Sequence, residues 1–335
     1  MRIHKRALIA AAMAVVVLAA AGCAPPSGGG KKIIRLCHSH KADPVGDELH
    51  FAAVVFRDHV NANSDTLEVR IYAGNALGEE RTVCEALQVG AGPTCIISGT
   101  AIFNNFCPAT SVIDLPYLWE SYDHAHRSLD GRVGRVLAGE LERRGFKVLA
   151  WMDSWGYRNL VTTRRVVRGP SDIAGLKIRT IQTPVYVAGV KMLGANATPM
   201  AGGEVYSSLQ TGILDGFEHT AAMVASGRYY EVAKHIALTR HFFGPLVFAY
   251  SKKQWDTLTD EERRVVTEAA RLARDEQRKL ASARDAEALR KLTENNMTVN
   301  EVDTRDFRRS AVRLQDRVAA RVGAEDLLRM IRAER

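Results

Sequence analysis

The sequence predicts an α/β protein built of two lobes, and three observations support this prediction. Hydrophobic residues make up 46% and charged residues 25% of the 335 positions, which excludes disordered, collagen-like and small disulfide-stapled proteins. Strand-like and helix-like segments alternate in the first half of the chain, and the alternation returns in the second half. A helical pattern over residues 259–295 is longer than a single lobe requires.

The first half of the chain alternates short apolar strands with amphipathic helices. Strands are predicted at residues 33–37, 67–72 and 95–97, where apolar residues alternate or run together. Helices are predicted at residues 48–60 and 79–89, where apolar residues recur at three- and four-residue steps. Helices between successive strands indicate a largely parallel sheet.

The second half repeats this pattern. Strands are predicted at residues 148–151 and 177–179. Helices are predicted at residues 184–193, which have a proline in the first turn and a glycine after the end, and at residues 204–210. A second α/β lobe is the simplest account of these segments.

The late helical pattern begins with a capping box formed by Thr259 and Glu262. No glycine or proline interrupts it up to residue 295. At 1.5 Å per residue it would extend about 54 Å, so we expect one helix that runs along both lobes. Two helices with an unmarked break are the alternative.

The N-terminus has the pattern of an export signal. Basic residues precede an apolar run over residues 7–21, which is too short for a membrane span. Residues 18–23 (Leu-Ala-Ala-Ala-Gly-Cys) resemble a bacterial lipobox, which predicts a lipoprotein signal peptide over residues 1–22 and a lipid anchor on Cys23. Cleavage after an Ala-x-Ala motif is the alternative, because an alanine stands where leucine is usual.

The segment that follows predicts a tether. Residues 23–31 contain two prolines and three glycines and cannot bury a core. No later stretch reaches 18 apolar residues, so we expect a periplasmic protein that is lipid-anchored rather than membrane-spanning. The net charge is +8, and three of the basic residues lie in residues 1–22. Without a basic run, this modest excess favours steering of anionic small molecules over nucleic-acid binding.

Four further cysteines lie early in the chain, at Cys37, Cys84, Cys95 and Cys107. Their spacing contains no CxxC motif, so a zinc site is not indicated. In an exported protein they form one or two disulfides or stay buried thiols, and the sequence does not decide between these alternatives.

Several sequence motifs follow one another along the chain. They are Asp-Leu-Pro-Tyr-Leu-Trp at 114–119, Gly-Phe-Lys-Val-Leu-Ala-Trp at 145–151, Gly-Tyr-Arg-Asn at 156–159, Asp-Ile-Ala-Gly-Leu-Lys-Ile-Arg-Thr at 172–180, Leu-Gly-Ala-Asn-Ala-Thr-Pro-Met at 193–200 and Glu-Val-Tyr-Ser-Ser-Leu-Gln-Thr-Gly-Ile-Leu-Asp-Gly at 204–216. Together they resemble the substrate-binding subunits of tripartite ATP-independent periplasmic (TRAP) transporters of the DctP type, and the resemblance covers essentially the whole chain from about residue 32.

The resemblance implies a two-lobed periplasmic binding protein of a type II-like fold that closes on a carboxylate ligand and delivers it to a membrane permease. It implies a monomer without enzymatic activity or cofactor. Hinge strands are expected near residues 153–158 and 242–246. Lobe I would comprise residues 32–154 and 244–283, and lobe II residues 155–243 and 284–335.

Two arginines are the first candidates for ligand binding. The resemblance implies that Arg179, at the end of a predicted strand, clamps the ligand carboxylate, which suits a planar, permanently charged guanidinium. Arg158 matches a second arginine of the family that approaches the ligand. A structural salt bridge is the alternative role of Arg158.

Two positions depart from the family pattern. His219 stands where asparagine is usual, and its charge near neutral pH would strengthen beside an anion. Gly202 stands where a large aromatic residue is common, so either the ligand is bulky, such as a six-carbon sugar acid or an aromatic acid, or Phe242 or Trp155 fills the space. The sequence leaves this choice open.

Polar residues at two further strand ends are candidates to contact the ligand from the opposite lobe. His38 could donate a hydrogen bond to the ligand, and Ser98 could pair with a ligand oxygen. Some members of the family bind their ligand through a cation, but His38 and His40 alone make a poor metal site and no carboxylate partner is evident nearby. We therefore predict no metal.

Other functions find less support. An exported hydrolase would need a nucleophile with a positioned base, and no Gly-x-Ser-x-Gly, HExxH or P-loop motif is present. A binding protein for a sensor or for another importer would use the same fold, and the sequence does not separate it from a transport role.

Overall fold

The computed structural model describes residues 30–335. The predicted signal peptide over residues 1–22 and the lipid anchor on Cys23 lie outside the described residues, as does almost all of the tether predicted at 23–31. Residues 31–335 form one compact unit.

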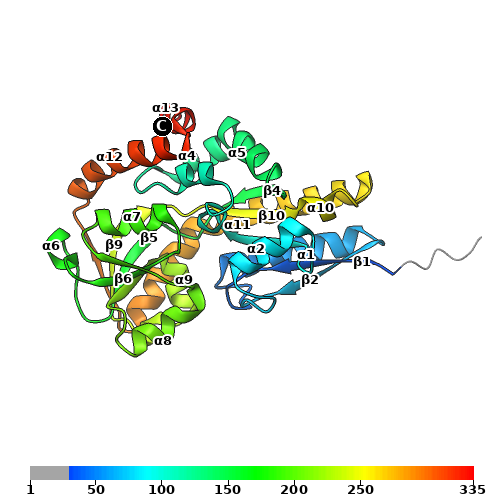
Figure 1. The fold of residues 1–335 in the computed structure, drawn as a ribbon. Coiled ribbons are helices and arrows are strands. Elements are labelled where there is room, and N and C mark those ends of the chain that lie inside the picture. Colours follow the sequence, from blue (N-terminus) through cyan, green and yellow to red (C-terminus); the bar gives the residue numbers. More distant parts are fainter. Residues whose placement is uncertain (1–29) are drawn as a thin grey trace, which may run out of the picture. The chain divides into compact units, whose positions relative to one another are not determined.

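The first sheet has five strands, in the order β2-β1-β3-β10-β4. Figure 1 labels four of them, β1, β2, β4 and β10. Strand β1 is parallel to β2 and β3, whereas β10 is antiparallel to β3 and β4. The strands are β1 (Lys32–Cys37), β2 (Leu67–Tyr72), β3 (Cys95–Gly99), β4 (Phe146–Met152) and β10 (Leu246–Ser251).

The second sheet has six strands, in the order β11-β9-β5-β8-β6-β7. Strand β5 is antiparallel to both β8 and β9, and the remaining pairs are parallel. The strands are β5 (Arg158–Thr162), β6 (Lys177–Thr180), β7 (Asn196–Pro199), β8 (Gly216–His219), β9 (His235–Phe242) and β11 (Thr298–Glu301).

Both sheets are therefore mixed. The strands predicted at residues 33–37, 67–72 and 95–97 pair in parallel, as expected, whereas β10 and β5 add antiparallel pairs. The reason is that the chain crosses directly between the sheets. It leaves the first sheet after β4 and enters the second at β5, and it returns from β9 to β10. No helix intervenes at either crossing, so neither crossing makes the right-handed strand–helix–strand unit that keeps strands parallel. The crossings at 153–157 and 243–245 lie where the hinge strands were expected, and their bending stays a prediction.

The helices predicted at residues 48–60, 79–89, 184–193 and 204–210 are present within a few residues at each end, and further helices that the periodicity did not predict also cover the sheets. In the first half the helices are α1 (Glu48–Asn63), α2 (Glu80–Val89), α3 (Thr100–Phe103), the 3₁₀ helix η1 (Pro108–Asp114), α4 (Tyr122–Asp130) and α5 (Arg132–Glu142). In the second half they are α6 (Pro170–Ile173), α7 (Pro184–Met192), η2 (Gly202–Glu204), α8 (Val205–Gln210), α9 (Ala221–Ser226), η3 (Tyr229–Glu231) and α10 (Lys252–Trp255).

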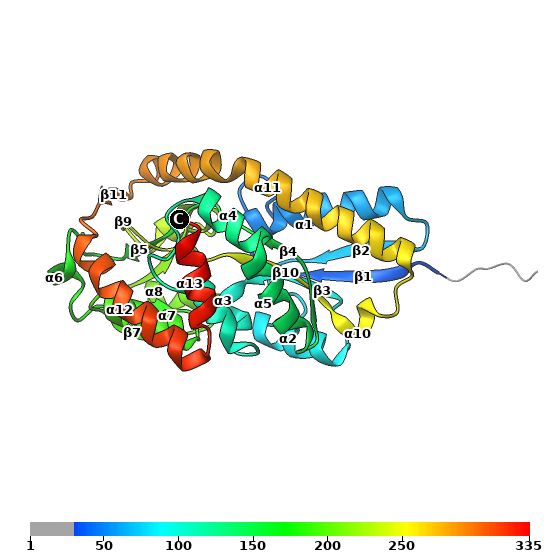
Figure 2. The same cartoon turned by 90° about the horizontal axis from the view of Figure 1, so that it is seen from above.

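The long helix α11 (Asp260–Glu294) is a single helix of 35 residues, which confirms that prediction. Its capping box is formed by Thr259 and Glu262. The helix packs against α1 and β4 beside the first sheet and against α9 and β11 beside the second (Figure 2). Its apolar residues enter the core of each lobe in turn, with Val266 in one and Leu292 in the other.

The last two helices, α12 (Arg305–Val322) and α13 (Glu325–Ala333), pack back across the molecule. Helix α12 contacts α7 and η1, and α13 contacts α5. His124 of α4 is also hydrogen-bonded through Nε2 to the carbonyl of Ile331 at 2.8 Å. The predicted boundaries, with 32–154 and 244–283 in lobe I and 155–243 and 284–335 in lobe II, stay a prediction, and these contacts tie residues 305–335 to segments of both.

Cys37, Cys84, Cys95 and Cys107 are free buried thiols in this structure, so of the two sequence alternatives it contains the thiols. Burial raises the pKa of Cys37 to about 12, which keeps that thiol protonated and unreactive. Among residues 30–335, no helix combines the length and the apolarity that crossing a bilayer requires.

Candidate ligand-binding site

A cavity of about 530 Å³ lies between the two sheets. This volume falls within the range of small-molecule sites. Strands β1, β3, β6 and β8 all end beside it, as expected for an α/β protein, whose ligands bind beyond the carboxyl ends of parallel strands. Its titratable lining residues include His40, Asp47, Glu48, Glu80, Arg158, Arg179 and His219.

Arg179 lines this cavity from the end of β6, and only 6% of its surface is exposed. Its Nε and Nη2 atoms donate to the carbonyl of Met200 at 2.9 and 2.6 Å. These bonds hold the guanidinium plane in place, and neither of them uses Nη1. Burial lowers the pKa of Arg179, but the ordinary value is so high that the group stays charged.

Arg158 lies at the start of β5 and is paired with Glu218 on the neighbouring strand β8. Its Nη2 donates to the side-chain Oε1 of Glu218 at 3.0 Å and to the backbone carbonyl of the same residue at 2.9 Å. The structural salt bridge considered in the sequence analysis is thus present, and Arg158 lines the cavity as well. The two roles coexist because different nitrogens of the guanidinium serve them.

His219 brings a third donor to the same place. Its Nδ1 accepts a hydrogen bond from the backbone N–H of Thr220 at 2.9 Å, so a neutral ring carries its proton on Nε2. This Nε2 lies 3.4 Å from Nη1 of Arg158. Because both atoms are then donors, they do not satisfy each other, and together they can donate to one acceptor placed between them.

Without a ligand, His219 is a neutral residue at neutral pH. Burial, together with the charges of Arg158, His40 and Arg179, holds the pKa of His219 well below its ordinary value. The residue therefore acts as a neutral donor in the ligand-free site. The gain of charge expected beside a bound anion stays a prediction.

Gly202 lies in η2 on the cavity wall. A Cβ atom at this position would come no closer than 3.9 Å to Nη2 of Arg179, so the space beside it is open. Phe242 is buried and stacked on Tyr186 with ring centroids 4.2 Å apart, and Trp155 is fully buried. Neither lines the cavity. The space left by Gly202 is thus not filled by the aromatic residues that the sequence suggested.

His38 and Ser98 are placed behind the wall rather than on it. His38 is 1% exposed and lies 3.0 Å from Nδ1 of His50 through its own Nε2. Ser98 is fully buried and donates from Oγ to Oε1 of Glu80 at 2.5 Å. Glu80 itself lines the cavity. Sequence reasoning missed Glu80, whose only signal was its place in the first turn of a predicted helix.

His40, Asp47 and Glu48 form a compact group on the wall of the first lobe, with one nitrogen or oxygen atom of each residue within 4.8 Å of the others. Nδ1 of His40 lies 2.8 Å from Oδ2 of Asp47. The expectation of no carboxylate near the histidines was wrong, because Asp47 is the N-cap residue of α1 and its Oδ2 reaches His40. The N-cap position was the signal that could have identified Asp47.

Charges within this group are strongly coupled. Burial opposes the charged form of His40, but the Asp47 carboxylate outweighs it and raises the pKa of His40 to about 9. Burial and the neighbouring Asp47 carboxylate raise the pKa of Glu48 to about 7. Both oxygens of Glu48 are buried and lack a hydrogen-bond partner among the described residues.

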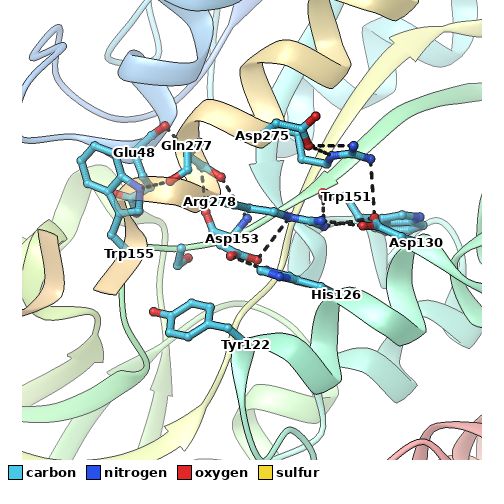
Figure 3. Close-up of polar contacts among 12 residues, drawn as sticks. Glu48, Tyr122, His126, Asp130, Trp151, Asp153, Trp155, Asp275, Gln277 and Arg278 are labelled. Atoms are coloured by element: carbon cyan, nitrogen blue, oxygen red, sulfur yellow. Dashed lines mark hydrogen bonds and ion pairs between the residues drawn. The ribbon is translucent and has the colours of Figure 1, made fainter. Parts of the chain in front are cut away.

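The first crossing between the sheets is anchored to α11 by polar contacts (Figure 3). Gln277 accepts from the backbone N–H of Asp153 at 3.1 Å and donates to its carbonyl at 2.8 Å. The buried Asp153 carboxylate lies 2.7 Å from Nε2 of His126. Trp155 donates from Nε1 to the carbonyl of Gln277 at 3.1 Å. The crossing is therefore fixed at its start to the helix that spans both lobes.

Two α/β lobes joined by crossing strands, with a charged cavity between them, define a two-lobed solute-binding protein. The comparisons with known proteins agree. Residues 38–321 match the family described as bacterial extracellular solute-binding protein, family 7 (DctP). The chain belongs to this family, whose members are substrate-binding proteins and not enzymes.

Similar proteins are also solute-binding proteins. The 2,3-diketo-L-gulonate-binding periplasmic protein of Escherichia coli is 34% identical over 237 residues, which are 70% of this chain and 72% of that protein. The TRAP periplasmic solute-binding protein of Polaromonas sp. JS666, bound to D-erythronate, has a TM-score of 0.85 at 30% identity and covers 90% of this chain and 99% of its own. The corresponding protein of Chromohalobacter salexigens, bound to D-glucuronate, has a TM-score of 0.85 at 30% identity over 90% of this chain and 100% of its own.

Proposed function

We propose that this protein binds a sugar-derived carboxylic acid in the cavity between its lobes and delivers it to the membrane subunits of a TRAP transporter. The acid would be of about the size of a hexuronate. Transport by this route needs no chemical change in the ligand, in keeping with a family of binding proteins.

The observation that carries the proposal is the convergence of donors at one end of the cavity. Nη1 of Arg158 and Nε2 of His219 lie 3.4 Å apart, and Arg179 makes both of its bonds to Met200 through Nε and Nη2, which leaves its Nη1 for a ligand. A carboxylate accepts several hydrogen bonds at once and balances the two guanidinium charges. We assign the ligand carboxylate to this end.

Acceptors on the facing wall favour a hydroxylated ligand over an aromatic one. Glu80 lines the cavity, and Ser98 orients its carboxylate from behind. A carboxylate accepts hydrogen bonds from hydroxyl groups but offers nothing to an apolar ring. The open space at Gly202 provides room for a longer carbon chain. Ser98 thus acts through Glu80 in this proposal, and His38 and Phe242 support the wall.

The ligands of relatives support the same class. The solved relatives hold D-erythronate and D-glucuronate, and the Escherichia coli relative is a 2,3-diketo-L-gulonate-binding protein. All of these are polyhydroxylated or oxidised sugar acids. The ligand of this chain is proposed within that class.

A screen of acids tests the proposal. The melting temperature of the purified protein is measured in the presence of D-glucuronate, D-galacturonate, D-erythronate, succinate, malate or benzoate. Each acid that raises it is then titrated by calorimetry. One of the sugar acids should raise the melting temperature most and bind one-to-one. Stabilisation by succinate, malate or benzoate alone would contradict the sugar-acid assignment.

The tether is proposed to keep the receptor near its permease at the periplasmic face of the membrane. Acylation of Cys23 would supply this anchor, as the lipobox-like residues 18–23 suggest. Cell fractionation tests it, because Cys23→Ser should move the protein from the membrane fraction to the soluble periplasmic fraction. An unchanged distribution would argue for cleavage after the Ala-x-Ala motif instead.

A further inference from the structure

We propose that His40, Asp47 and Glu48 bind one divalent cation of the Mn²⁺ to Zn²⁺ series on the cavity wall of the first lobe. The chain would then carry a second binding site beside the one for the organic acid. Cation binding at this place does not depend on the identity of the acid.

The three side chains are close enough to share one ion. Their ligand atoms all lie within 4.8 Å of one another. At metal–ligand distances of about 2.0–2.2 Å, two ligands on one ion are separated by up to about 4.4 Å. A small side-chain rotation therefore closes the group around a cation, without a backbone movement.

An independent observation is the state of Glu48. The residue is fully buried, and neither of its carboxylate oxygens has a hydrogen-bond partner among the described residues. A buried carboxylate without a partner is costly, and the Asp47 carboxylate beside it adds repulsion. A cation shared with Asp47 and His40 would satisfy both carboxylates.

The group also has the outer support that metal ligands need. Oδ1 of Asp47 accepts from the backbone N–H groups of Leu49 and His50, at 3.1 Å each, which fixes the carboxylate at the start of α1. The other oxygen, Oδ2, faces Nδ1 of His40 and has the Ser226 hydroxyl at 3.5 Å from the second lobe. Orientation of ligands by such secondary contacts is typical of built metal sites.

The donor set indicates the kind of cation. One imidazole nitrogen and two carboxylates suit Mn²⁺, Fe²⁺ or Zn²⁺, whereas Ca²⁺ and Mg²⁺ prefer oxygen ligands only. On binding, the ion takes the place of the proton that His40 and Asp47 share, and this proton leaves to solvent. Three protein ligands leave coordination positions for other groups.

These positions are next to the acid site. All three residues line the cavity, and the rings of His40 and His219 have centroids 6.0 Å apart. An oxygen of the bound acid could therefore complete the coordination, a consequence that rests on the proposed function.

Calorimetric titration with MnCl₂ and with ZnCl₂ tests the site, using untagged protein without any organic acid. We expect one ion per chain, with Glu48→Gln weakening the affinity about tenfold or more. Glu79→Gln is the matched control, because it removes an exposed carboxylate from the rim of the same cavity, and its affinity should equal that of the unaltered protein.

A second variant, His40→Gln, keeps the test decisive if Glu48→Gln unfolds, which its circular dichroism and melting temperature would reveal. It removes the nitrogen ligand and should weaken both ions. Absence of binding at millimolar metal, or equal affinities in the unaltered protein and either folded variant, would overturn the proposal. Because no acid is present, this failure is separate from failure of the acid screen.

Discussion

At the scale of single residues, Arg179 is oriented before any ligand arrives. Two of its nitrogens are held by the carbonyl of Met200, so a ligand meets a donor that has already lost most of its rotational freedom. Pre-organisation of this kind lowers the entropic cost of binding.

We expect Arg179→Ala to weaken binding of the cognate sugar acid about 30- to 1000-fold. This corresponds to about 2–4 kcal/mol for a charge-assisted bond in a desolvated site. Arg179→Lys should restore only part of the affinity, because an ammonium group lacks the planar fork that bonds to the Met200 carbonyl and to the ligand at the same time. Calorimetry measures both, and an unaltered affinity in Arg179→Ala would remove this residue from the site.

His219 should behave as a neutral donor between pH 8 and pH 6. Since burial and three positive neighbours hold its pKa well below the ordinary value, the ring takes up no proton in this window. His219→Asn replaces one neutral donor with another. The ratio of affinities at pH 6 and pH 8 should therefore be the same in the variant and in the unaltered protein.

Calorimetry at both pH values checks this expectation. A smaller gain at pH 6 in His219→Asn would show that the ligand anion draws a proton onto the ring after all.

The residues that could be predicted from the sequence were those inside a local motif. Arg179 and Arg158 stand in recognisable segments, and both line the cavity. Glu48 could not be found in this way, because its importance comes from the fold, which buries it without a partner beside a histidine eight residues earlier. Burial of a polar group is a tertiary property, whereas the periodicity of α1 shows only that a helix is present.

At the scale of elements, α11 was predictable from the sequence and the direction of β10 was not. The capping box and the absence of glycine and proline define α11 from local chemistry alone. The direction of β10 depends on the crossing after β9, which brings the chain back to the first sheet in the middle of that sheet. This return depends on contacts between residues that are far apart in the sequence, and no local sequence pattern indicates it.

The short element η2 sets the size of the cavity in our proposal. Gly202→Phe should place a ring in the open space beside Arg179. The affinity for the sugar acid should fall about tenfold or more, whereas the affinity for smaller diacids such as succinate should fall less. The ring would overlap the ligand and remove apolar burial worth about 25 cal/mol per Å².

Gly202→Ala is the matched control, because its Cβ meets only an ordinary contact at 3.9 Å. The preference for the sugar acid over smaller diacids should be almost unchanged in Gly202→Ala. A thermal-shift series over the acids compares the three proteins. Equal preference in Gly202→Phe and the unaltered protein would mean that the ligand does not extend towards η2.

Helix α11 stabilises the crossing through Gln277. This fully buried side chain makes two hydrogen bonds to the backbone of Asp153 and a third, at 3.3 Å, to the carbonyl of Glu48. Gln277→Met keeps the volume and removes all three bonds, leaving buried backbone groups unpaired. We expect a loss of about 2–4 kcal/mol in the free energy of unfolding, measured with urea. A loss below about 0.5 kcal/mol would indicate that water replaces the amide.

At the scale of the whole molecule, the two lobes are joined by two short crossings and by α11. The crossings at 153–157 and 243–245 have no partner strands of their own, so they can change their backbone angles while each sheet stays intact. The cavity between the lobes receives charged residues from both, which means that a bound acid contacts both at once. A ligand that contacts both lobes favours the arrangement in which they are closest.

Closure should therefore accompany binding, and small-angle scattering can measure it. Saturating sugar acid should reduce the radius of gyration of the unaltered protein, because the lobes approach around the crossings. Arg179→Ala at the same acid concentration is the control, since it should remain unsaturated and keep the radius of the ligand-free protein. The comparison separates closure from any general effect of the acid on the solution. Identical curves for the unaltered protein with and without ligand would mean that the acid binds to a cavity whose lobes are already in place, and that the crossings hold the lobes rather than bend.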